Sequence, residues 1–581
     1  MLIGFFVKSA GGLHWTLAAW VFIHLVLFST PLAFSKGFDF IIYDAPPDSL
    51  WKYYGFFVIF LFVFYVFRII LFYLLGAVGV SFAAPPELPN KDLTIWFDSP
   101  AAEWEREGLP SGNGAMGAVV MGGVNKDIIQ YNEKTLWEGG PGSKEGYDFG
   151  WPTVSQVNAL EDVQSEVLKK GLIAPEAAAN KMGRPTKGYG HYQSFGDVII
   201  EALKPTKEYT NYRRTLDIDR AVANVAYESK GVHYHREYFA SYPDSVIVSR
   251  LTASARSAIS VKLSLTVPDN RTVSYRYKND VLLAEGALLE NGLRYVTALK
   301  VKVNGGTVKH QDNSLVISEA DSVDIVWSAA TNYRQAYPLY RSKLDVAAVT
   351  QRVVSASKKT YSELLHDHLE DYQRLFRRVA LDIGQAMPDV TTPSLLSAYQ
   401  GGSAVADRAL EHLYFQYGRY LLIASSRAGS LPANLQGVWN NSARPPWNAD
   451  YHVNINLQMN YWPAEVTNLS ETTVPFFDFV DSLVEPGRIA AKKIVGAEGW
   501  TLFLNTNIWG FTGVIAWPTA FWQPEAAAWL AQHYYEHYLF NLDPTFLENR
   551  AYPVMKEASK FWLDALRLNP ETNQWNVIPS F

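Results

Sequence analysis

The sequence predicts a multidomain α+β protein in which a β-rich domain precedes a mainly helical one. Residues 91–332 contain strand-like segments, such as Tyr234–Tyr242 and Ile259–Thr266, in which β-branched and aromatic residues recur between Gly, Asp, Asn and Pro turns. Helical periodicity replaces this pattern from Asp345 onward, where apolar residues recur at steps of three and four. A chain of 581 residues, 48% of them hydrophobic, is long enough for several cores, roughly three to four domains by length.

Residues 1–84 differ in composition from the rest of the chain. Residues 13–34 are a mostly apolar run long enough to span a bilayer, and residues 53–80 are a second run that Arg68 interrupts. One interpretation is a pair of transmembrane helices, through which the chain would contact a membrane. A lone Arg near the middle of a span is costly in a bilayer, which favours a second interpretation.

The second interpretation is a signal peptide. Arg68 supplies the basic start, Ile69–Val80 the apolar core and Ser81–Ala83 a small-x-small cleavage site, so the mature chain would begin at Ala84. The first ~65 residues would then come from a start site assigned too far upstream. Both interpretations place the remaining residues outside the cytoplasm, either periplasmic or secreted, and anchored to the membrane if the segment is not cleaved.

Three segments follow in order. Residues 91–335 are the predicted β-rich domain of sandwich type, residues 345–390 a helical linker and residues 391–581 a helical domain. A helical domain with long polar loops can be a toroid of helical hairpins whose loops meet at one end. Its predicted helices, separated by Pro- and Gly-rich loops, are Ala404–Ser426, Val474–Val495, Glu525–Phe540 and Thr545–Leu568.

Charge and composition argue against several functional classes. The formal net charge of −6 and the lack of a long Lys/Arg run argue against electrostatic binding to nucleic acid. With no Cys, the chain has no disulfide, no thiolate metal site and no Cys nucleophile. His533 and His537 lie four residues apart, but Glu536 is displaced from the position that a zinc-binding HExxH motif requires. We therefore predict neither a metal site nor a cofactor.

The stretch Leu431–Glu471 is dense in Asn, Trp and Pro and has few aliphatic residues for its length. Amides and carboxylates bind sugar hydroxyls, and aromatic rings stack against the C–H faces of sugars. The composition of this stretch is therefore typical of a carbohydrate site. The aromatic content of the whole chain, 14%, suits such stacking but equally suits ordinary large cores.

Several stretches also carry a family resemblance. They are LPSGNGAMGAVVMGGVNKDIIQYNEKTLWEGGPG at Leu109–Gly142, Tyr192–Asp197 with YRRTLD at Tyr212–Asp217, YGRYLL at Tyr417–Leu422 with LPANLQGVWN and NINLQMNYWPAE in Leu431–Glu471, and Asn505–Gly510 with Trp517–Tyr538 and Ala551–Pro553. From about Leu93 to the last residue, the chain resembles the fucosidases of glycoside hydrolase family 95.

This resemblance implies an N-terminal β-supersandwich, a helical linker and an (α/α)6 barrel that holds the active site. A C-terminal β-domain follows the barrel in the family, and residues 391–581 would be the first part of the barrel. The implied activity is hydrolysis of terminal α-L-fucosyl groups, commonly 1,2-linked to galactose, with inversion at the anomeric carbon. The implied partner is therefore a fucosylated glycan substrate, although some relatives act on α-L-galactosides.

The resemblance assigns the catalytic water to an asparagine pair that maps onto Asn454 and Asn456. A neutral amide is a poor proton acceptor, so its task would be to orient water through its carbonyl while a nearby Asp increases the polarisation. An extended backbone would point side chains at spacing two in the same direction. Ordinary turn formation is the alternative role for two asparagines in a Pro-rich loop.

The remaining site residues are predicted to bind substrate. His452 would share the face of Asn454 and contact a fucose hydroxyl, or else be an ordinary packed histidine. Glu465 resembles a substrate-binding or hydrogen-bond-anchoring carboxylate of the family and not its general acid. The other candidates are stacking walls or core residues at Trp439, Trp447 and Trp462, and residues of the β-domain that either reach the barrel or serve a turn at Asn132 and Glu133.

The general acid implied by the family is a Glu that follows a Pro-Ser-x sequence, and the sequence stops at Pro579-Ser580-Phe581. The expected Glu would lie beyond the last residue, as would the Asp that supports the water. Residues 391–581 also offer only about half of the helices that such a barrel needs. We therefore predict that this chain is a fragment and inactive alone. The alternative function is a membrane-anchored carbohydrate-binding protein without catalysis.

Overall fold

The computed structural model describes residues 90–311, 313–517 and 520–580. The chain divides into two compact units, Met1–Leu88 and Pro89–Phe581, and the described residues belong to the second. The predicted membrane spans at 13–34 and 53–80, and the alternative signal peptide, lie outside the described residues. Among the helices of the described ranges, none is both long and apolar enough to cross a membrane.

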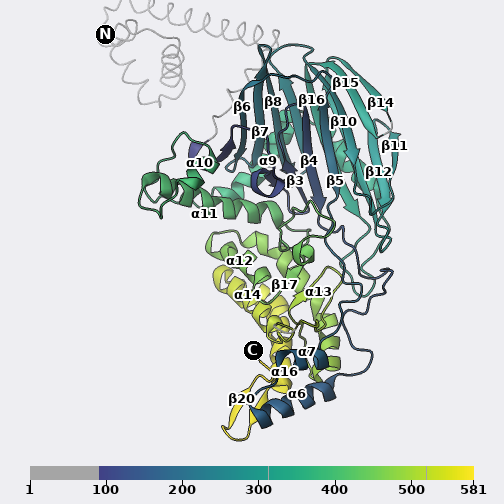
Figure 1. Cartoon of the computed structure of the whole chain (residues 1–581), viewed down its shortest axis with the longest axis vertical. Helices are drawn as coiled ribbons and strands as arrows, with labels where there is room; N and C mark the ends of the chain where they lie inside the picture. Colours follow the sequence, from purple (N-terminus) through teal and green to yellow (C-terminus); the bar gives the residue numbers. More distant parts are fainter. Residues whose placement is uncertain (1–89, 312, 518–519, 581) are drawn as a thin grey trace, which may run out of the picture. The chain divides into compact units, whose positions relative to one another are not determined.

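Two antiparallel sheets form the β-rich domain (Figure 1). In the described residues, the first sheet has nine strands in the order β1-β6-β7-β8-β9-β16-β13-β12-β11. Their bounds are β1 (Thr94–Phe97), β6 (Thr210–Asp217), β7 (Val222–Ser229), β8 (Val232–Ser241), β9 (Val246–Ala253), β11 (Ser274–Lys278), β12 (Val281–Ala287), β13 (Arg294–Asn304) and β16 (Ser322–Thr331).

The second sheet has seven strands over the same described ranges, in the order β14-β15-β10-β5-β4-β3-β2. Side chains from the two sheets meet in a shared core, where the Tyr131 hydroxyl lies 2.7 Å from Thr297 Oγ1 of the facing sheet. The predicted β-sandwich is therefore confirmed. The strands are β2 (Leu109–Gly112), β3 (Met116–Val120), β4 (Lys126–Glu133), β5 (Gly196–Ala202), β10 (Ile259–Thr266), β14 (Thr307–Gln311) and β15 (Ser314–Ala320).

A helical arm interrupts the β-domain between β4 and β5, which the sequence analysis did not predict. Helices α6 (Val157–Lys170) and α7 (Pro175–Met182) leave the sheets and pack against the last helices of the chain (Figure 1). Leu160, Val163 and Met182 are almost fully buried there. The signal was present, since Leu160, Val163 and Val167 recur at helical spacing before a left-handed Gly171.

The predicted helical linker consists of two helices, α8 (Val346–Lys358) and α9 (Tyr361–Phe376). Helix α8 buries Val349 and Val353 against β13 and β16 of the first sheet. Thr360 separates the helices and caps α9, because its hydroxyl accepts from Glu363 N–H while the Glu363 carboxylate accepts from Thr360 N–H.

The rest of the described chain is mainly helical, as predicted. Helix α12 lies inside the Asn- and Trp-rich stretch and was not predicted, because it has Pro463 inside it and lacks a clear apolar stripe. The longer helices are α11 (Val405–Ser425), α12 (Asn456–Val466), α13 (Val474–Ala490), α14 (Ala526–Asn541) and α16 (Tyr552–Ala565).

Shorter elements complete the described structure. They are η1 (Lys91–Leu93), α5 (Trp104–Glu107), α10 (Thr392–Ser397), η2 (Pro446–Ala449), β17 (Tyr451–His452), η3 (Ser470–Thr473), η4 (Ala491–Val495), β18 (Asn505–Thr506), α15 (Pro544–Phe546), η5 (Leu547–Ala551), β19 (Arg567–Asn569) and β20 (Gln574–Asn576).

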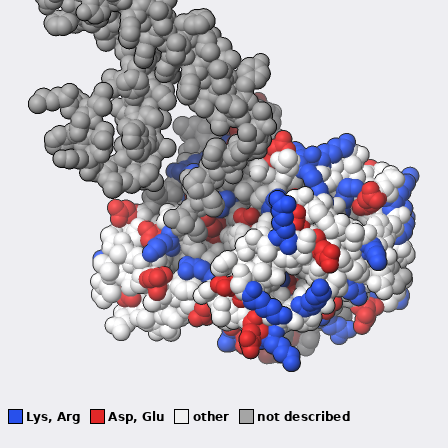
Figure 2. Space-filling model, turned by 90° about the horizontal axis from the view of Figure 1, so that it is seen from above, with Lys and Arg blue, Asp and Glu red and all other residues white. Residues whose placement is uncertain are grey.

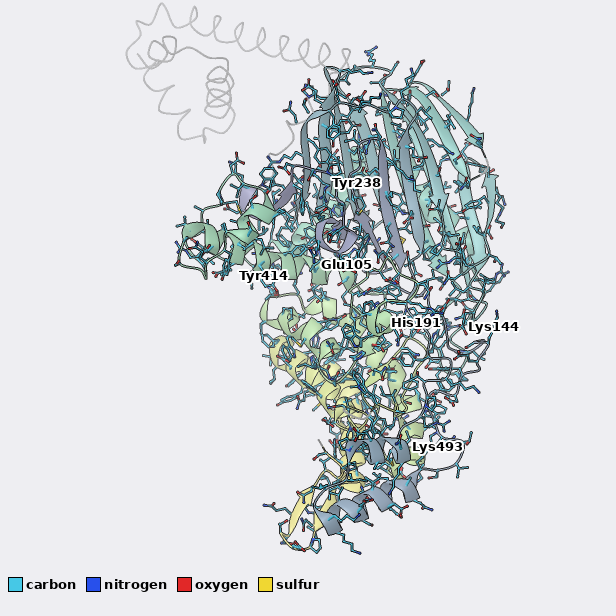
Figure 3. All side chains as sticks on the ribbon, viewed as in Figure 1. Glu105, Lys144, His191, Tyr238, Tyr414 and Lys493 are labelled. Carbon is cyan, nitrogen blue, oxygen red and sulfur yellow. The ribbon has the colours of Figure 1, made fainter. Side chains whose placement is uncertain are left out.

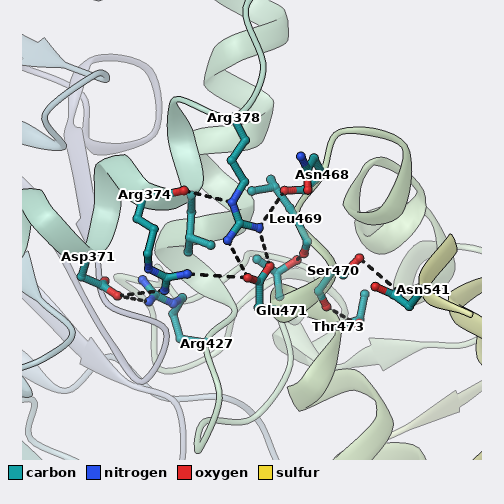
Figure 4. Close-up of polar contacts among 12 residues, drawn as sticks. Asp371, Arg374, Arg378, Arg427, Asn468, Leu469, Ser470, Glu471, Thr473 and Asn541 are labelled. Atoms are coloured by element: carbon teal, nitrogen blue, oxygen red, sulfur yellow. Dashed lines mark hydrogen bonds and ion pairs between the residues drawn. The ribbon is translucent and has the colours of Figure 1, made fainter. Parts of the chain in front are cut away.

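An ion-pair network joins the linker to the helical domain (Figure 4). Arg378, just after α9, lies 2.6 Å from Glu471 of η3, and Arg374 of α9 lies 3.7 Å from the same carboxylate. Asp371 of α9 pairs with Arg427, which follows α11, at 2.7 Å. The Glu471 pairs are partly exposed and contribute little individually, whereas the Asp371–Arg427 pair is largely buried.

Candidate active site

The loop of residues 431–450 is built onto the β-sandwich. Asn132 of β4 grips it by a two-point contact, because its amide N–H donates to Asn440 O at 2.9 Å and its Oδ1 accepts from Asn440 N–H at 3.0 Å. The buried Lys134 Nζ donates to the carbonyls of Ser425 and Leu431. Both side chains therefore fix where the loop begins and where it crosses the sheet.

These contacts bear on Asn132 and Glu133, for which the sequence left open a reach to the helical domain or a turn. Asn132 is fully buried with both amide atoms bonded, so it anchors the loop and offers no surface to a sugar. Glu133 is 7% exposed and turns back to its own strand end, where its carboxylate accepts from Thr135 N–H and Oγ–H. Burial raises the pKa of Glu133 to about 7. Its neighbours give it a structural role instead of a substrate contact.

The loop ends in a run of left-handed backbone. Trp447, Asn448 and Ala449 have φ angles of 46°, 60° and 47°, a region that non-glycine residues rarely adopt. The carbonyl of Asn448 accepts from Tyr192 N–H at 3.0 Å, which ties the run to the segment that precedes β5. This strained run turns the chain into β17 and delivers Asp450 and His452.

Asp450 is the centre of a buried polar cluster. Its side chain is fully buried, and Oδ1 lies 2.5 Å from His452 Nδ1. Oδ2 accepts from Asn505 Nδ2 at 3.0 Å and lies 2.7 Å from the Tyr189 hydroxyl. Burial, followed by the Asp450 charge, raises the pKa of Tyr189 well above its usual value, so the hydroxyl keeps its proton.

Three of these residues were not predicted as site residues: Asp450, Tyr189 and Asn505. They come from segments far apart in the sequence and share no local motif. Tyr189 lies two residues before His191, which Figure 3 labels between the sheets and the helices. The one sequence signal was position, because Asp450 lies inside the predicted stretch Leu431–Glu471 and Asn505 begins a stretch that carries the family resemblance.

The predicted asparagine pair lies at a turn and not on extended backbone. Residues 453–455 turn, and Asn456 is the first residue of α12. Asn454 Oδ1 is buried and, among the described residues, has no hydrogen-bond partner. A buried carbonyl oxygen without a partner is costly unless something else donates to it. The geometry therefore leaves Asn454 free to accept from a water or a hydroxyl.

Glu465 holds α12 against α14. Its Oε1 lies 2.5 Å from His537 Nδ1, and its Oε2 accepts from the Ser470 hydroxyl and from Asn541 Nδ2. The carboxylate is only 7% exposed. These contacts match the anchoring role, and they occupy both oxygens. Within the described ranges, no group of three or more His, Asp or Glu side chains is arranged to hold a metal ion.

The three predicted stacking residues differ in exposure. Trp439 is 8% exposed and donates through Nε1 to Ser111 O at 2.8 Å, so it is chiefly a core residue. Trp447 and Trp462 are 65% and 47% exposed and present open ring faces. A core role for at least one Trp was the alternative interpretation, and Trp439 fits it.

A cleft of about 790 Å³ lies between the sandwich, α11 and α12. Asn460 and Pro463 line it from α12, whereas Asn454 and Asn456 are not among its lining residues. Several amide and aromatic side chains line the cleft: Gln436, Asn440, Asn441, Asn460, Trp104, Tyr417 and Trp439.

The face shown in Figure 2 intersperses Lys and Arg with Asp and Glu. Charge on this face is therefore mixed. The candidate site combines the Asp450 carboxylate with amides, a hydroxyl and an imidazole, groups that hydrogen-bond the hydroxyls of a sugar.

Comparison with known proteins gives the family. Residues 360–581 match the model of the glycosyl hydrolase family 95 catalytic domain, and residues 95–336 match that of the glycosyl hydrolase family 65 N-terminal domain. The chain is 33% identical over 527 residues to "Alpha-L-fucosidase 2" of Arabidopsis thaliana, covering 83% of this chain and 61% of that protein. It is 32% identical over 514 residues to "Probable alpha-fucosidase A" of Aspergillus niger, covering 85% and 62%.

The chain thus spans about three-fifths of the length of these curated relatives. Among solved structures, that described as "Putative kojibiose phosphorylase from human microbiome" superposes with a TM-score of 0.56 at 10% identity, covering 83% of this chain and 61% of that chain. This likeness supports the order of a sheet-rich domain followed by a helical one. The chain belongs to glycoside hydrolase family 95.

Proposed function

We propose that the protein is an inverting α-L-fucosidase, of which this chain supplies the water-positioning and sugar-binding half of the site. The observation that carries the proposal is the buried, unpartnered Asn454 Oδ1 beside the His452–Asp450 pair, in a chain of this family. Neutral acceptors around a fixed imidazole suit a hydroxyl-rich ligand and a bound water.

Inversion requires an acid beside the leaving oxygen and an activated water on the opposite face, with the two carboxyl groups roughly 6.5–9.5 Å apart. Asn454 and Asn456 would orient that water through their carbonyl oxygens. An amide cannot take the proton at neutral pH, so a carboxylate must complete the base function. Asp450 and Glu465 have their oxygens committed to neighbouring donors, which leaves neither as the general acid.

The proposed substrate is a glycan with a terminal α-L-fucosyl group, 1,2-linked to galactose. The curated relatives are named as fucosidases, and the exposed rings of Trp447 and Trp462 could stack on the sugars that follow fucose. We also propose, from the composition of residues 1–84, that the protein works outside the cytoplasm.

The test uses the purified 581-residue chain and α-L-fucosyl-(1→2)-galactose. We expect saturation-transfer NMR to show contact with the fucosyl protons, and we expect no release of fucose. Failure to bind would contradict the assignment of a fucosyl site. Release of fucose would contradict the prediction that this chain lacks the general acid, and the anomer that appears first would then report inversion or retention.

A further inference from the structure

The two short strands β17 and β18 bring a histidine and an asparagine together. They pair antiparallel, with Tyr451 opposite Thr506 and His452 opposite Asn505. Residues directly opposite on antiparallel strands project to the same face, with Cβ atoms about 4.5–5.5 Å apart. Asn505 is 5% exposed and His452 is partly buried, so both side chains stand at the edge of the same buried polar cluster.

Asp450 decides which atoms of this pair remain available. An ionised carboxylate only accepts hydrogen bonds, so the His452 Nδ1 atom 2.5 Å away must carry a proton. The same logic fixes the Asn505 amide, whose Nδ2 donates to Asp450 Oδ2 and to the Tyr189 hydroxyl, each at 3.0 Å. The polar atoms of this pair that remain free to bind a ligand are Nε2 of His452 and Oδ1 of Asn505.

The second of these atoms is a buried acceptor that lacks a donor. Asn505 Oδ1 has no hydrogen-bond partner among the described residues, and its amide cannot rotate without bringing that oxygen against the Asp450 carboxylate. In its Nδ1–H tautomer, His452 carries a second acceptor at Nε2, and its side chain projects to the same face as Asn505. Two acceptors on one face match two neighbouring hydroxyls that both donate.

We propose that Asn505 Oδ1 and His452 Nε2 together bind a vicinal pair of hydroxyls on the pyranose ring, and that Asp450, supported by Tyr189, is the positioning residue for both. A site built to accept from two hydroxyls discriminates strongly against a sugar that lacks either one, because a buried acceptor is then left unpaired. The identity of the sugar rests on the proposed function. The orientation of the two side chains rests only on their contacts with Asp450.

The orientation is tested first, without sugar. In the full chain labelled with ¹⁵N-histidine, the ¹⁵N shifts of His452, assigned by its loss in His452→Gln, should report the Nδ1–H tautomer at neutral pH. Asp450→Asn should move these shifts toward a mixture of tautomers. A wild-type His452 protonated at Nε2 alone would overturn the role of Asp450, whatever the chain binds.

The contact is tested with methyl α-L-fucopyranoside and its mono-O-methyl ethers. We expect Asn505→Ala to raise the dissociation constant about fivefold to tenfold, and Asn224→Ala, a half-buried asparagine of β7, to leave it unchanged. Unimpaired binding by Asn505→Ala would overturn the contact while leaving the fucosyl site intact. Absence of binding by the wild type would overturn both the proposed function and the Asn505 contact, but not the tautomer. Melting temperatures monitor the folding of each variant. If Asp450→Asn unfolds, Tyr189→Phe replaces it, because this variant keeps the Asp450 carboxylate and should retain the Nδ1–H tautomer of His452. Loss of that tautomer in Tyr189→Phe would count against the proposed positioning.

Discussion

Replacing Glu133 by Gln should make the fold more stable at high pH and leave sugar binding unchanged. Burial raises the pKa of this carboxyl from 4.5 to about 7, so the folded state holds a proton that the unfolded state releases. A pKa that is higher in the folded state means that stability falls as pH rises between these two values. A difference of about 2.5 units means that Glu133 by itself lowers the free energy of unfolding by about 3 kcal/mol between pH 4.5 and 8.

Gln keeps the acceptor for Thr135 and does not ionise, so Glu133→Gln should gain about 3 kcal/mol over the wild type on going from pH 4.5 to pH 8. Urea unfolding followed by circular dichroism at several pH values measures this difference. Glu201→Gln, which removes an exposed carboxylate of β5 that lies 3.6 Å from Lys126, is the matched control and should change stability by less than about 1 kcal/mol.

The pH dependence of stability must be compared between Glu133→Gln and wild type, because His368 also titrates in this range. It is buried, donates from Nε2 to Arg220 O at 2.9 Å, and burial lowers its pKa to about 4. A lowered histidine pKa means that stability falls as pH drops from about 6.5 to about 4, opposite in sign to the effect of Glu133. The pH dependence of the wild type alone therefore does not isolate the effect of Glu133. A difference between Glu133→Gln and wild type that does not grow with pH would refute the reasoning.

Three other changes test the site. Asn132→Ala removes both hydrogen bonds to the Asn440 backbone, so it should lower the free energy of unfolding by about 1–3 kcal/mol and speed hydrogen exchange of the Asn440 amide. Unchanged exchange at Asn440 would count against the anchoring role of Asn132. Trp439→Ala should lower the free energy of unfolding by about 3–5 kcal/mol, because this side chain is buried. Trp462→Ala should lower it by less than about 1 kcal/mol and weaken glycan binding. Equal losses of stability would contradict the assigned burial. Glu465→Gln should destabilise by about 3 kcal/mol or more, because His537 loses its buried carboxylate, and an unchanged melting temperature would show that the pair does not hold α12 to α14.

The order of the domains could be predicted because hydrophobic periodicity changes from strand-like to helix-like along the chain. The β-sandwich and the linker helices follow from that change alone. Helices α6 and α7 were missed although their spacing was clear, because they interrupt a long run of strands. Helix α12 was missed for the opposite reason, since its buried residues Leu457, Tyr461 and Ala464 are separated by polar and Trp residues and by Pro463.

The sequence selected a candidate stretch but not the tertiary contacts that surround it. Composition and resemblance selected Leu431–Glu471, which contains the candidates His452, Asn454 and Glu465. The Asp450 cluster could not be predicted, because Tyr189 and Asn505 meet it through tertiary contacts that leave no local pattern. Asn132 and Glu133 show the converse: adjacent residues on one strand point to different neighbours, so proximity in sequence to a reachable loop did not indicate a sugar contact.

The helical arm α6–α7 affects how the chain can be divided. It starts in the β-domain, yet Leu160, Val163 and Met182 share a core with Ile494, Phe503 and Phe561 of the helical domain. Gln164 of the arm also donates to Ile578 O at 3.0 Å. Residues 360–581 cut out alone would expose that apolar surface to water, so the segment that matches the catalytic domain is not a free-standing folding unit. An insertion in one domain completes the core of the next, so we expect the two domains to fold together.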